Sequence, residues 1–461
     1  MSRLPSGLPA RSLALAAVLA AVAAAACADP PLAPAERVGT PTAEIAAGAF
    51  GLAPIFAVIG VDGFQEGFTH TADITAPVAP APWGPTAGWS VVRHQRDPAS
   101  WHQIEPMDAW HGSMCQRPDD AVEPTHPVRK YRDLVFLCRN HLMTANNASG
   151  YGVTYLTPGR LVDFSNGTAV VRFDVATKRE SGRDWIDLWL TPYADNLVAP
   201  LDDSLPDLQG EPRRAVHVRM TAQRSRSAFQ ASVVDDFVGV ALPTADRRGY
   251  EEAFAARGLV PSATRRDTFE LHISRTHVRF GMPRYGLWWV DAPLPRSLDW
   301  SQAVVQLGHH SFDPRADGGS PTTWHWDNVG ASPAVPFTII RAEDRYVDAT
   351  TPRGELVFGT PAPAGAHLRG MFLGATEVSV AGPDGRFGRW SPVTLQAQRR
   401  RLPERFASFW MPVPAGTTRA RFRALRTPGA DAGPWMVRDV ELWANPGGLA
   451  PADPTQGSGR P

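Results

Sequence analysis

The sequence predicts an all-β protein: an antiparallel β-sandwich followed by a second, smaller β-sandwich. Short runs of alternating apolar and polar residues recur along the chain, and glycine, proline, asparagine and aspartate separate them. Helical periodicity is scarce, so the pattern favours sheets packed face to face. At 461 residues the chain is too long for one small domain, and its 15 tryptophans supply ample core material.

Two segments show the strand pattern most clearly. Residues 168–175 carry an apolar side chain at every odd position, which places Arg172 and Asp174 on the opposite face. Residues 269–273 and 277–280 flank a turn and predict a β-hairpin. The same pattern predicts further strands at 285–291, 303–307, 337–341 and 355–358.

The first 27 residues predict export. Two arginines precede an apolar run that is too short to span a bilayer comfortably, and small residues then lead to Cys27. This segment resembles a bacterial lipoprotein signal, which implies that Cys27 is lipidated and anchors the exported chain to a membrane. Simple cleavage and secretion is the alternative, because Ala24 stands where a leucine is usual.

Two cysteines remain once Cys27 is set aside, namely Cys115 and Cys138. An exported protein matures in an oxidising compartment, so we expect a disulfide between them. Two free buried thiols are the alternative.

The formal net charge of the chain is zero, and this balance does not favour a nucleic-acid partner.

A domain boundary is predicted between residues 345 and 346. Two Trp-containing segments are each typical of the last strand that closes the edge of a sandwich, and they lie at 323–329 and 433–443. We therefore expect an Ala/Pro-rich flexible tether, two sandwiches and a disordered tail, over residues 28–54, 55–345, 346–445 and 446–461.

One predicted strand, residues 184–190, presents an acid between two large aromatic rings. Period-two alternation places Ile186, Leu188 and Leu190 on an apolar face, and Trp185, Asp187 and Trp189 on the other. Tryptophan stacks on the apolar face of a sugar, and a carboxylate accepts hydrogen bonds from hydroxyl groups. This face predicts a glycan-binding platform. Burial of both rings in a second core layer is the alternative.

Residues 55–345 resemble the concanavalin A-like lectin and glucanase sandwich (jelly roll). The resemblance rests on short motifs in matching order: Gly63 to Phe68, Trp89 to Val92, Tyr151 to Phe164, a hairpin over 168–190, Thr268 to Phe280 and the closing Trp326-Asp-Asn-Val329. It implies a carbohydrate ligand. The second sandwich resembles only a generic accessory module.

In the family 16 glycoside hydrolases of this superfamily, the strand that matches 185–190 carries two catalytic glutamates around a central aspartate. Here the three positions are Trp185, Asp187 and Trp189, so only the central acid is present. Retaining hydrolysis needs two carboxylates in different protonation states. The resemblance therefore implies binding without this hydrolysis.

A relocated site for a hydrolase or lyase is an open alternative. If 168–175 pairs with 184–190, Arg172 and Asp174 share a face with Asp187, and Glu270 and His272 could face the same cleft. A surface of solvated charges is the competing interpretation of these side chains.

The resemblance also implies a structural calcium ion between the first and last strands. Asp327, with Glu66 or Asp62, provides the oxygen ligands that calcium prefers. The alternative is that Asp327 and Asn328 satisfy backbone groups of a turn. Zinc at His309-His310 is disfavoured, because adjacent residues of a strand point to opposite faces.

Three functions therefore remain open at this level. The leading prediction is an exported, lipid-anchored carbohydrate-binding protein without hydrolytic activity. A glycoside hydrolase or polysaccharide lyase with a non-standard acid pair is the second. A structural or adhesion protein of the cell surface, without a glycan ligand, is the third.

Overall fold

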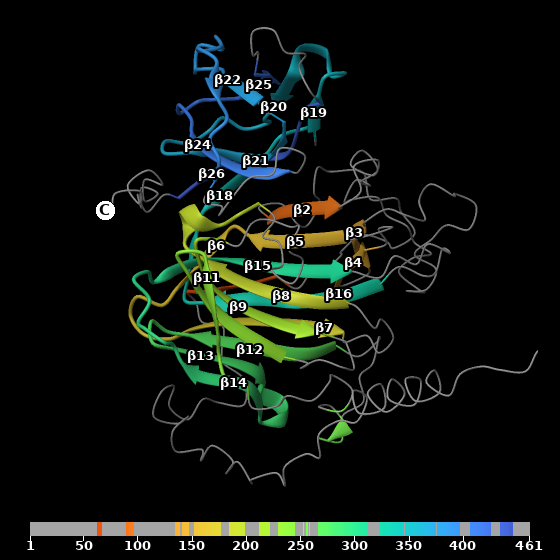
Figure 1. Cartoon of the computed structure of the whole chain (residues 1–461), viewed down its shortest axis with the longest axis vertical. Coiled ribbons are helices and arrows are strands. Elements are labelled where there is room, and N and C mark those ends of the chain that lie inside the picture. The colour runs from red at the N-terminus through yellow and green to blue at the C-terminus, as the bar shows by residue number, and fades with distance from the viewer. Residues whose placement is uncertain are drawn as a thin grey trace, which may run out of the picture. The chain divides into compact units, whose positions relative to one another are not determined.

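The computed structural model describes most of both predicted sandwiches. The described residues are 62–66, 89–95, 134–138, 141–146, 152–176, 184–198, 212–221, 229–244, 252, 255–256, 258, 266–311, 322–344, 346–374, 376–396, 406–425 and 434–445. The described residues do not include the predicted signal, tether and tail, and they do not include Cys27, Cys115 or the side chain of Cys138, so the predicted lipidation and disulfide lie outside the description. Antiparallel strands dominate, which confirms the predicted all-β class (Figure 1). No helix in the described part is long and apolar enough to cross a membrane.

The first sandwich contains two antiparallel sheets, called sheet A and sheet B. Sheet A is built from β1 (Phe64–Glu66), β3 (Leu134–Cys138), β4 (His141–Asn146), β7 (Ala169–Ala176), β12 (Arg266–Ile273), β13 (His277–Met282), β14 (Leu287–Pro293) and β16 (Thr322–Ser332). Its order is β14-β13-β12-β7-β16-β4-β3, and β1 also pairs with β16.

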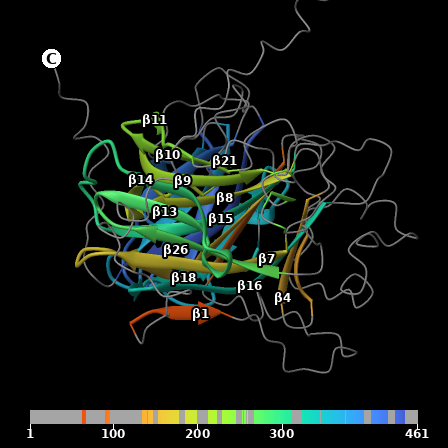
Figure 2. The same cartoon turned by 90° about the horizontal axis from the view of Figure 1, so that it is seen from below.

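Sheet B contributes the second layer. Its strands are β2 (Trp89–Gln95), β5 (Gly152–Pro158), β6 (Arg160–Asp163), β8 (Asp184–Thr191), β9 (Arg214–Thr221), β10 (Phe229–Asp235), β11 (Val238–Ala241), β15 (Gln302–Ser311) and β17 (Ala334–Pro336). Their order is β11-β10-β9-β8-β15-β5-β2, with β6 beside β15 and β17 beside β6. Figure 2 shows β10, β9, β8 and β15 as successive strands.

The core of the first sandwich lies between these sheets and follows the predicted alternation. Phe173 of β7 stacks on Phe269 of β12 from the side of sheet A, and Leu188 of β8 joins the same core from sheet B. Because alternate side chains of a strand point to opposite faces, the polar positions of β7 lie on the outer face of sheet A. The Trp185, Asp187 and Trp189 positions of β8 lie on the outer face of sheet B.

The expected pairing of 168–175 with 184–190 is wrong. Strand β7 pairs with β12 and β16, whereas β8 pairs with β9 and β15. Both strands carry a continuous apolar face, and both faces are buried in one core from opposite sides. The two strands therefore belong to different sheets, and their polar faces point away from each other.

The second sandwich has two smaller sheets and its own apolar core. One sheet contains β18 (Thr338–Arg341), β19 (Tyr346–Asp348), β21 (His367–Leu373), β24 (Ala407–Pro412) and β26 (Met436–Ala444). The other contains β20 (Glu355–Val357), β22 (Thr376–Val380), β23 (Ser391–Pro392) and β25 (Arg419–Ala424). Leu356, Phe409 and Phe422 are buried between them.

Two details of the predicted layout need correction. Strand β18 pairs with β26, so by sheet membership the second sandwich begins at Thr338, ahead of the predicted start at residue 346. The Trp-containing strands β16 and β26 do not close edges. Each lies inside its sheet, β16 between β7 and β4 and β26 between β18 and β21, because each has apolar contacts and hydrogen-bonding partners on both sides.

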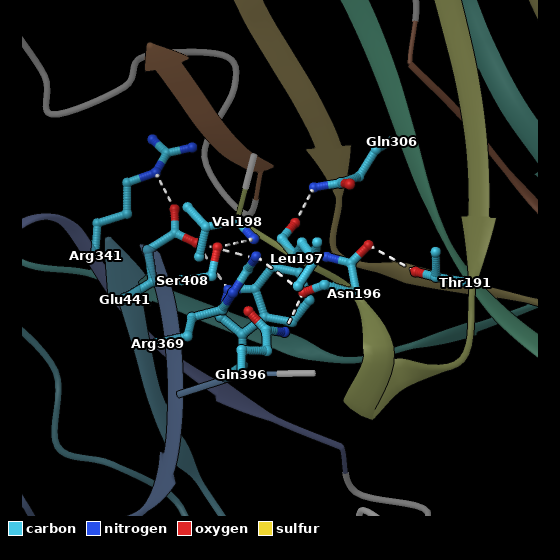
Figure 3. Close-up of polar contacts among 11 residues, drawn as sticks. Thr191, Asn196, Leu197, Val198, Gln306, Arg341, Arg369, Gln396, Ser408 and Glu441 are labelled. Carbon is cyan, nitrogen blue, oxygen red and sulfur yellow. Dashed lines mark hydrogen bonds and ion pairs between the residues drawn. The ribbon is translucent and has the colours of Figure 1, made fainter. Parts of the chain in front are cut away.

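The two sandwiches share a buried junction at residues 192–198, which follow β8 (Figure 3). The carbonyl oxygen of Asn196 accepts hydrogen bonds from Arg369 Nη2, at 3.2 Å, and from Gln396 Nε2. The backbone N–H of Val198 donates to Ser408 Oγ at 3.3 Å. Around this segment Tyr193, Phe337, Trp410 and Trp443 form one aromatic cluster.

Candidate functional site

Side chains from four strands of sheet B surround the carboxylate of Asp187 on the outer face of the sheet. They are Tyr155 from β5, Trp185 from β8, His217 and Arg219 from β9, and His310 from β15; with Asp187 they are called the Asp187 centre. Strand register explains the convergence, because Asp187 lies opposite Arg219 on one side and opposite Gly308 on the other.

Both oxygens of Asp187 are engaged by N–H groups. Oδ1 lies 2.8 Å from His217 Nε2 and accepts from Arg219 Nε at 3.0 Å. Oδ2 accepts from Trp185 Nε1 at 3.2 Å and lies 2.5 Å from His310 Nε2. The carboxylate is fully buried, so these four contacts replace its hydration.

The surroundings fix Asp187 in its ionised form. Burial alone would raise the pKa of this carboxyl, but His310, Arg219 and His217 together outweigh burial and hold the pKa well below its usual value. A carboxyl that stays ionised at neutral pH cannot donate a proton to a leaving group. Asp187 therefore acts as an electrostatic anchor for two imidazoles and one guanidinium.

The two tryptophans beside Asp187 do not form an exposed platform, which corrects the sequence prediction. Trp185 is 5% exposed and Trp189 is 3% exposed. Trp185 stacks on His310 with ring centroids 4.9 Å apart, and Trp189 stacks on His217 at 3.8 Å. The rings hold the imidazoles in place, as the alternative of a second buried layer anticipated.

A glycine makes room for the tyrosine of the centre. Tyr155 lies opposite Gly308 on the neighbouring strand, and its ring passes so close that a Cβ on Gly308 would lie 2.5 Å from Cε1 of Tyr155. The ring is fully buried, and its hydroxyl lies 2.9 Å from His310 Nε2. Only glycine at position 308 allows this close approach.

Apolar side chains of the second sandwich pack in the same cluster as Trp185 and Trp189. They come from β21, from the residue before β24 and from β26, and are Met371, Leu373, Phe406 and Met436. The outer face of sheet B is thus partly covered by the chain's own second sandwich. The members of the centre that reach the surface are His217 and Arg219, whose side chains are 10% and 11% exposed.

The outer face of sheet A carries four of the other predicted residues, namely Arg172, Asp174, Glu270 and His272. Glu270 Oε1 accepts from Arg172 Nε at 3.0 Å and from Arg172 Nη2 at 2.8 Å, and Glu270 Oε2 lies 2.8 Å from His272 Nε2. Asp174 is on this face too, where it accepts from Asn328 Nδ2 at 2.7 Å. The expectation that these residues share a cleft with Asp187 is wrong, because the core separates the two outer faces.

A tryptophan and a second ion pair flank Glu270 on sheet A. The Arg279 guanidinium lies 3.7 Å from the Trp288 ring centroid, and its Nε lies 3.5 Å from Asp291 Oδ2. Burial raises the pKa of Asp291, although Arg279, His277 and His272 oppose this effect. The positive charges on this face are therefore balanced by neighbouring carboxylates.

The predicted calcium ligands lie on neighbouring strands, but the described residues show no metal-binding group. Asp327 Oδ1 accepts from the backbone N–H of Asn328 at 2.8 Å, and Glu66 lies opposite Val329 in the pairing of β1 with β16. The side chain of Glu66 is outside the description, and no cluster of three or more metal-ligating side chains occurs among the described residues. Calcium remains a prediction.

The two adjacent histidines that were considered for zinc, His309 and His310, point to opposite faces of sheet B. His309 Nδ1 lies 3.0 Å from Thr144 Oγ1 inside the sandwich.

Sequence reasoning missed four members of the Asp187 centre. His217 and Arg219 alternate with Val216, Val218 and Met220, so the period-two pattern of β9 was available as a signal. Alternation from Leu307 likewise places His310 on the outer face. The role of Tyr155 depends on its approach to Gly308, which no periodicity reveals.

Comparisons with known proteins give only distant similarities. No family profile and no curated protein matches the chain. A carbohydrate-binding module of Bacillus subtilis is 9% identical, with a TM-score of 0.25 over 41% of this chain and 86% of that one. A Bacillus licheniformis β-glucanase is 11% identical, with a TM-score of 0.27 over 43% and 81%. A putative β-glucanase of Mycobacterium abscessus is 14% identical, with a TM-score of 0.30 over 58% and 98%.

TM-scores of this size carry no argument about the site or the function of this chain. The functional assignment therefore depends on the geometry of the Asp187 centre and on the sequence motifs.

Proposed function

We propose that the chain is an exported, lipid-anchored protein that binds carbohydrate through a concanavalin A-like sandwich and does not hydrolyse it. The observation that carries this proposal is that Asp187 holds Arg219 and His217 where their side chains reach the surface, at 11% and 10% exposure. Guanidinium and imidazole N–H groups donate hydrogen bonds to sugar hydroxyls. The Trp185 and Trp189 rings are buried and are assigned no ligand contact. Membrane anchoring rests on Cys27 and the apolar run before it.

The same geometry disfavours both catalytic alternatives. Asp187 has no proton to donate, and the acids of the other predicted pair lie on the opposite side of the sandwich. The acid pair that a hydrolase or a lyase would need is therefore not assembled around Asp187.

Binding can be tested with the chain lacking residues 1–27, screened against a glycan array and insoluble polysaccharides. The variant Arg219→Gln removes a guanidinium that reaches the surface of the centre, and we expect it to weaken binding about tenfold or more. Arg386→Gln is the matched control, because Arg386 is 90% exposed in a turn of the second sandwich.

Unfolding curves must show that the Arg219→Gln protein is folded before its binding is interpreted. Equal binding by Arg219→Gln and the parent chain would place the ligand elsewhere. Release of new reducing ends or of unsaturated sugars during incubation would favour the hydrolase or the lyase instead.

A further inference from the structure

The outer face of the four-stranded sheet in the second sandwich carries a row of arginines from β25. They are Arg419, Arg421 and Arg423. These positions alternate along the strand with buried core residues, so the arginine side chains share the outward face. Neighbouring strands place acids beside the row, because Glu355 of β20 lies opposite Arg421 and Glu377 of β22 lies opposite Arg423.

Two aromatic rings lie against this row instead of in the core. Phe387 and Trp390 belong to the loop between β22 and β23, and neither is part of the described apolar core of the second sandwich. The guanidinium carbon of Arg421 lies 3.7 Å from the centroid of the Phe387 ring, and that of Arg423 lies 4.1 Å from the centroid of the Trp390 ring. Each ring therefore forms a cation–π contact with one arginine of the row.

The same set of three groups occurs twice on this face. In each set a ring contacts a guanidinium, and Nε of that guanidinium donates to a carboxylate: Arg421 to Glu355 Oε2 at 3.0 Å, and Arg423 to Glu377 Oε2 at 2.8 Å. The two sets together are called the β25 strip, and its members are Phe387, Arg421, Glu355, Trp390, Arg423 and Glu377. Because two residues of a strand span about 7 Å, one extended chain can contact both sets.

Hydrogen bonds hold the loop that carries the two rings. The backbone N–H of Gly388 donates to the carbonyl oxygen of Val380 at 3.0 Å, and Ser379 Oγ donates to the carbonyl oxygen of Gly388 at 2.7 Å. Arg419 Nη2 donates to the carbonyl oxygen of Gly385 at 2.7 Å. An arginine whose Nε and flat face are already engaged loses little side-chain freedom when a ligand binds. The strip is therefore arranged for binding in advance.

The strip offers hydrogen-bond donors and acceptors next to each other. Among the described residues, Arg421 and Arg423 contact carboxylates through Nε alone, and their side chains are 34% and 39% exposed. A hydroxyl group both donates and accepts, so it can bond to a guanidinium and to the neighbouring carboxylate. Because every guanidinium of the row has a carboxylate partner, this face favours a neutral ligand with many hydroxyl groups over a polyanion.

We infer that the β25 strip is a second binding surface, which takes a neutral polysaccharide. The inference goes beyond the proposed function, because it assigns a ligand to the second sandwich and does not depend on the Asp187 centre. The half-buried rings of Phe387 and Trp390 contact the apolar faces of sugar units, and the Arg–Glu pairs bond to their hydroxyl groups.

Affinity electrophoresis tests the inference with the chain lacking residues 1–27. The gels contain mixed-linkage β-glucan, arabinoxylan, glucomannan or dextran, and polygalacturonate is the charged comparison. Trp390→Ala and Arg423→Gln each remove one member of the strip, and we expect each to weaken binding of a neutral polysaccharide about tenfold or more. Arg284→Gln is the matched control, because Arg284 is exposed on the first sandwich with its guanidinium carbon 5.8 Å from the Tyr285 ring centroid. It should bind like the parent chain.

Urea unfolding first establishes that each variant is folded. If folded Trp390→Ala and Arg423→Gln proteins both bind like the parent chain, the inference is overturned, and a loss confined to Arg219→Gln would at the same time support the proposed function. A loss confined to the two strip variants would support the inference and remove the Asp187 centre as the binding site. Preferred binding of polygalacturonate that is lost in Arg423→Gln would overturn the assignment of a neutral ligand. Absence of binding by the parent chain to every polysaccharide would overturn the inference and the proposed function together.

Discussion

Asp187 combines the features that make a buried carboxylate stable in a protein. Its two oxygens receive four N–H contacts, and three of the donors belong to side chains that carry or can carry positive charge. An unpaired buried carboxylate would be strongly destabilising, whereas a fully bonded one holds its partners in fixed positions. The position that the sequence assigns to ligand contact is therefore an internal organiser of the side chains that reach the surface, His217 and Arg219.

We predict that Asp187→Asn lowers the free energy of unfolding at pH 7 by about 3 kcal/mol, because the amide removes the charge and adds unwanted donors among N–H groups. The pKa of Asp187 is lower in the folded chain than in the unfolded one. Its stabilising effect is therefore complete above the usual carboxyl pKa of about 4 and declines as the pH falls below that value. Urea unfolding at pH 7 and at pH 3 measures the difference.

The difference in the free energy of unfolding between the parent chain and Asp187→Asn should be smaller at pH 3 than at pH 7. Asp384→Asn is a suitable control, because Asp384 is 60% exposed in a turn, and its replacement should change stability little at either pH. If the difference in unfolding free energy between the parent chain and Asp187→Asn were the same at both pH values, ionisation of Asp187 would contribute nothing to folding.

Strand existence could be predicted from alternation, but sheet membership could not. The patterns at 168–175, 184–190 and 269–280 all correspond to strands, namely β7, β8, β12 and β13. Their apolar faces are nevertheless compatible both with a hairpin in one sheet and with two strands facing each other across a core. Only the packed structure separates these arrangements. It also separates Asp174 from Asp187, and so decides which candidate residues belong to one site.

At the level of the element, the pairing of β5 with β15 depends on Gly308, which lies opposite Tyr155. We predict that Gly308→Ala destabilises the protein by about 1–3 kcal/mol, because the new Cβ would overlap the fully buried Tyr155 ring and force it to move. Gly239→Ala in β11 is the matched control, since a Cβ there meets nothing within 4 Å. Urea unfolding measures both variants. Equal effects would show that strand propensity, and not the approach of Tyr155, accounts for the loss.

For the whole molecule, the junction makes the two sandwiches depend on each other. Arg369 is fully buried there, and burial lowers its pKa to about 10, although Glu441 and Tyr193 raise it. The sequence did not indicate this junction, because Met371, Leu373 and Phe406 are apolar residues of the kind that also fill the core of a single sandwich. Their packing with Trp185 and Trp189 explains why a predicted exposed platform is buried.

We predict from this junction that both sandwiches unfold in one cooperative transition. Apolar residues of the two sandwiches form shared clusters, so separating them would expose Trp189, Leu373 and Phe406 at a cost similar to opening a core. Calorimetry of the parent chain should therefore give a calorimetric enthalpy equal to the van't Hoff enthalpy.

Leu373→Ala should lower the free energy of unfolding by about 2–5 kcal/mol and divide the transition into two steps, because it weakens the coupling between the sandwiches. Leu356→Ala removes a side chain of the same size from the second sandwich's own core. It should lower Tm while the transition remains single, as long as the junction is intact. Two resolved transitions in the parent chain would show that the junction does not couple the sandwiches.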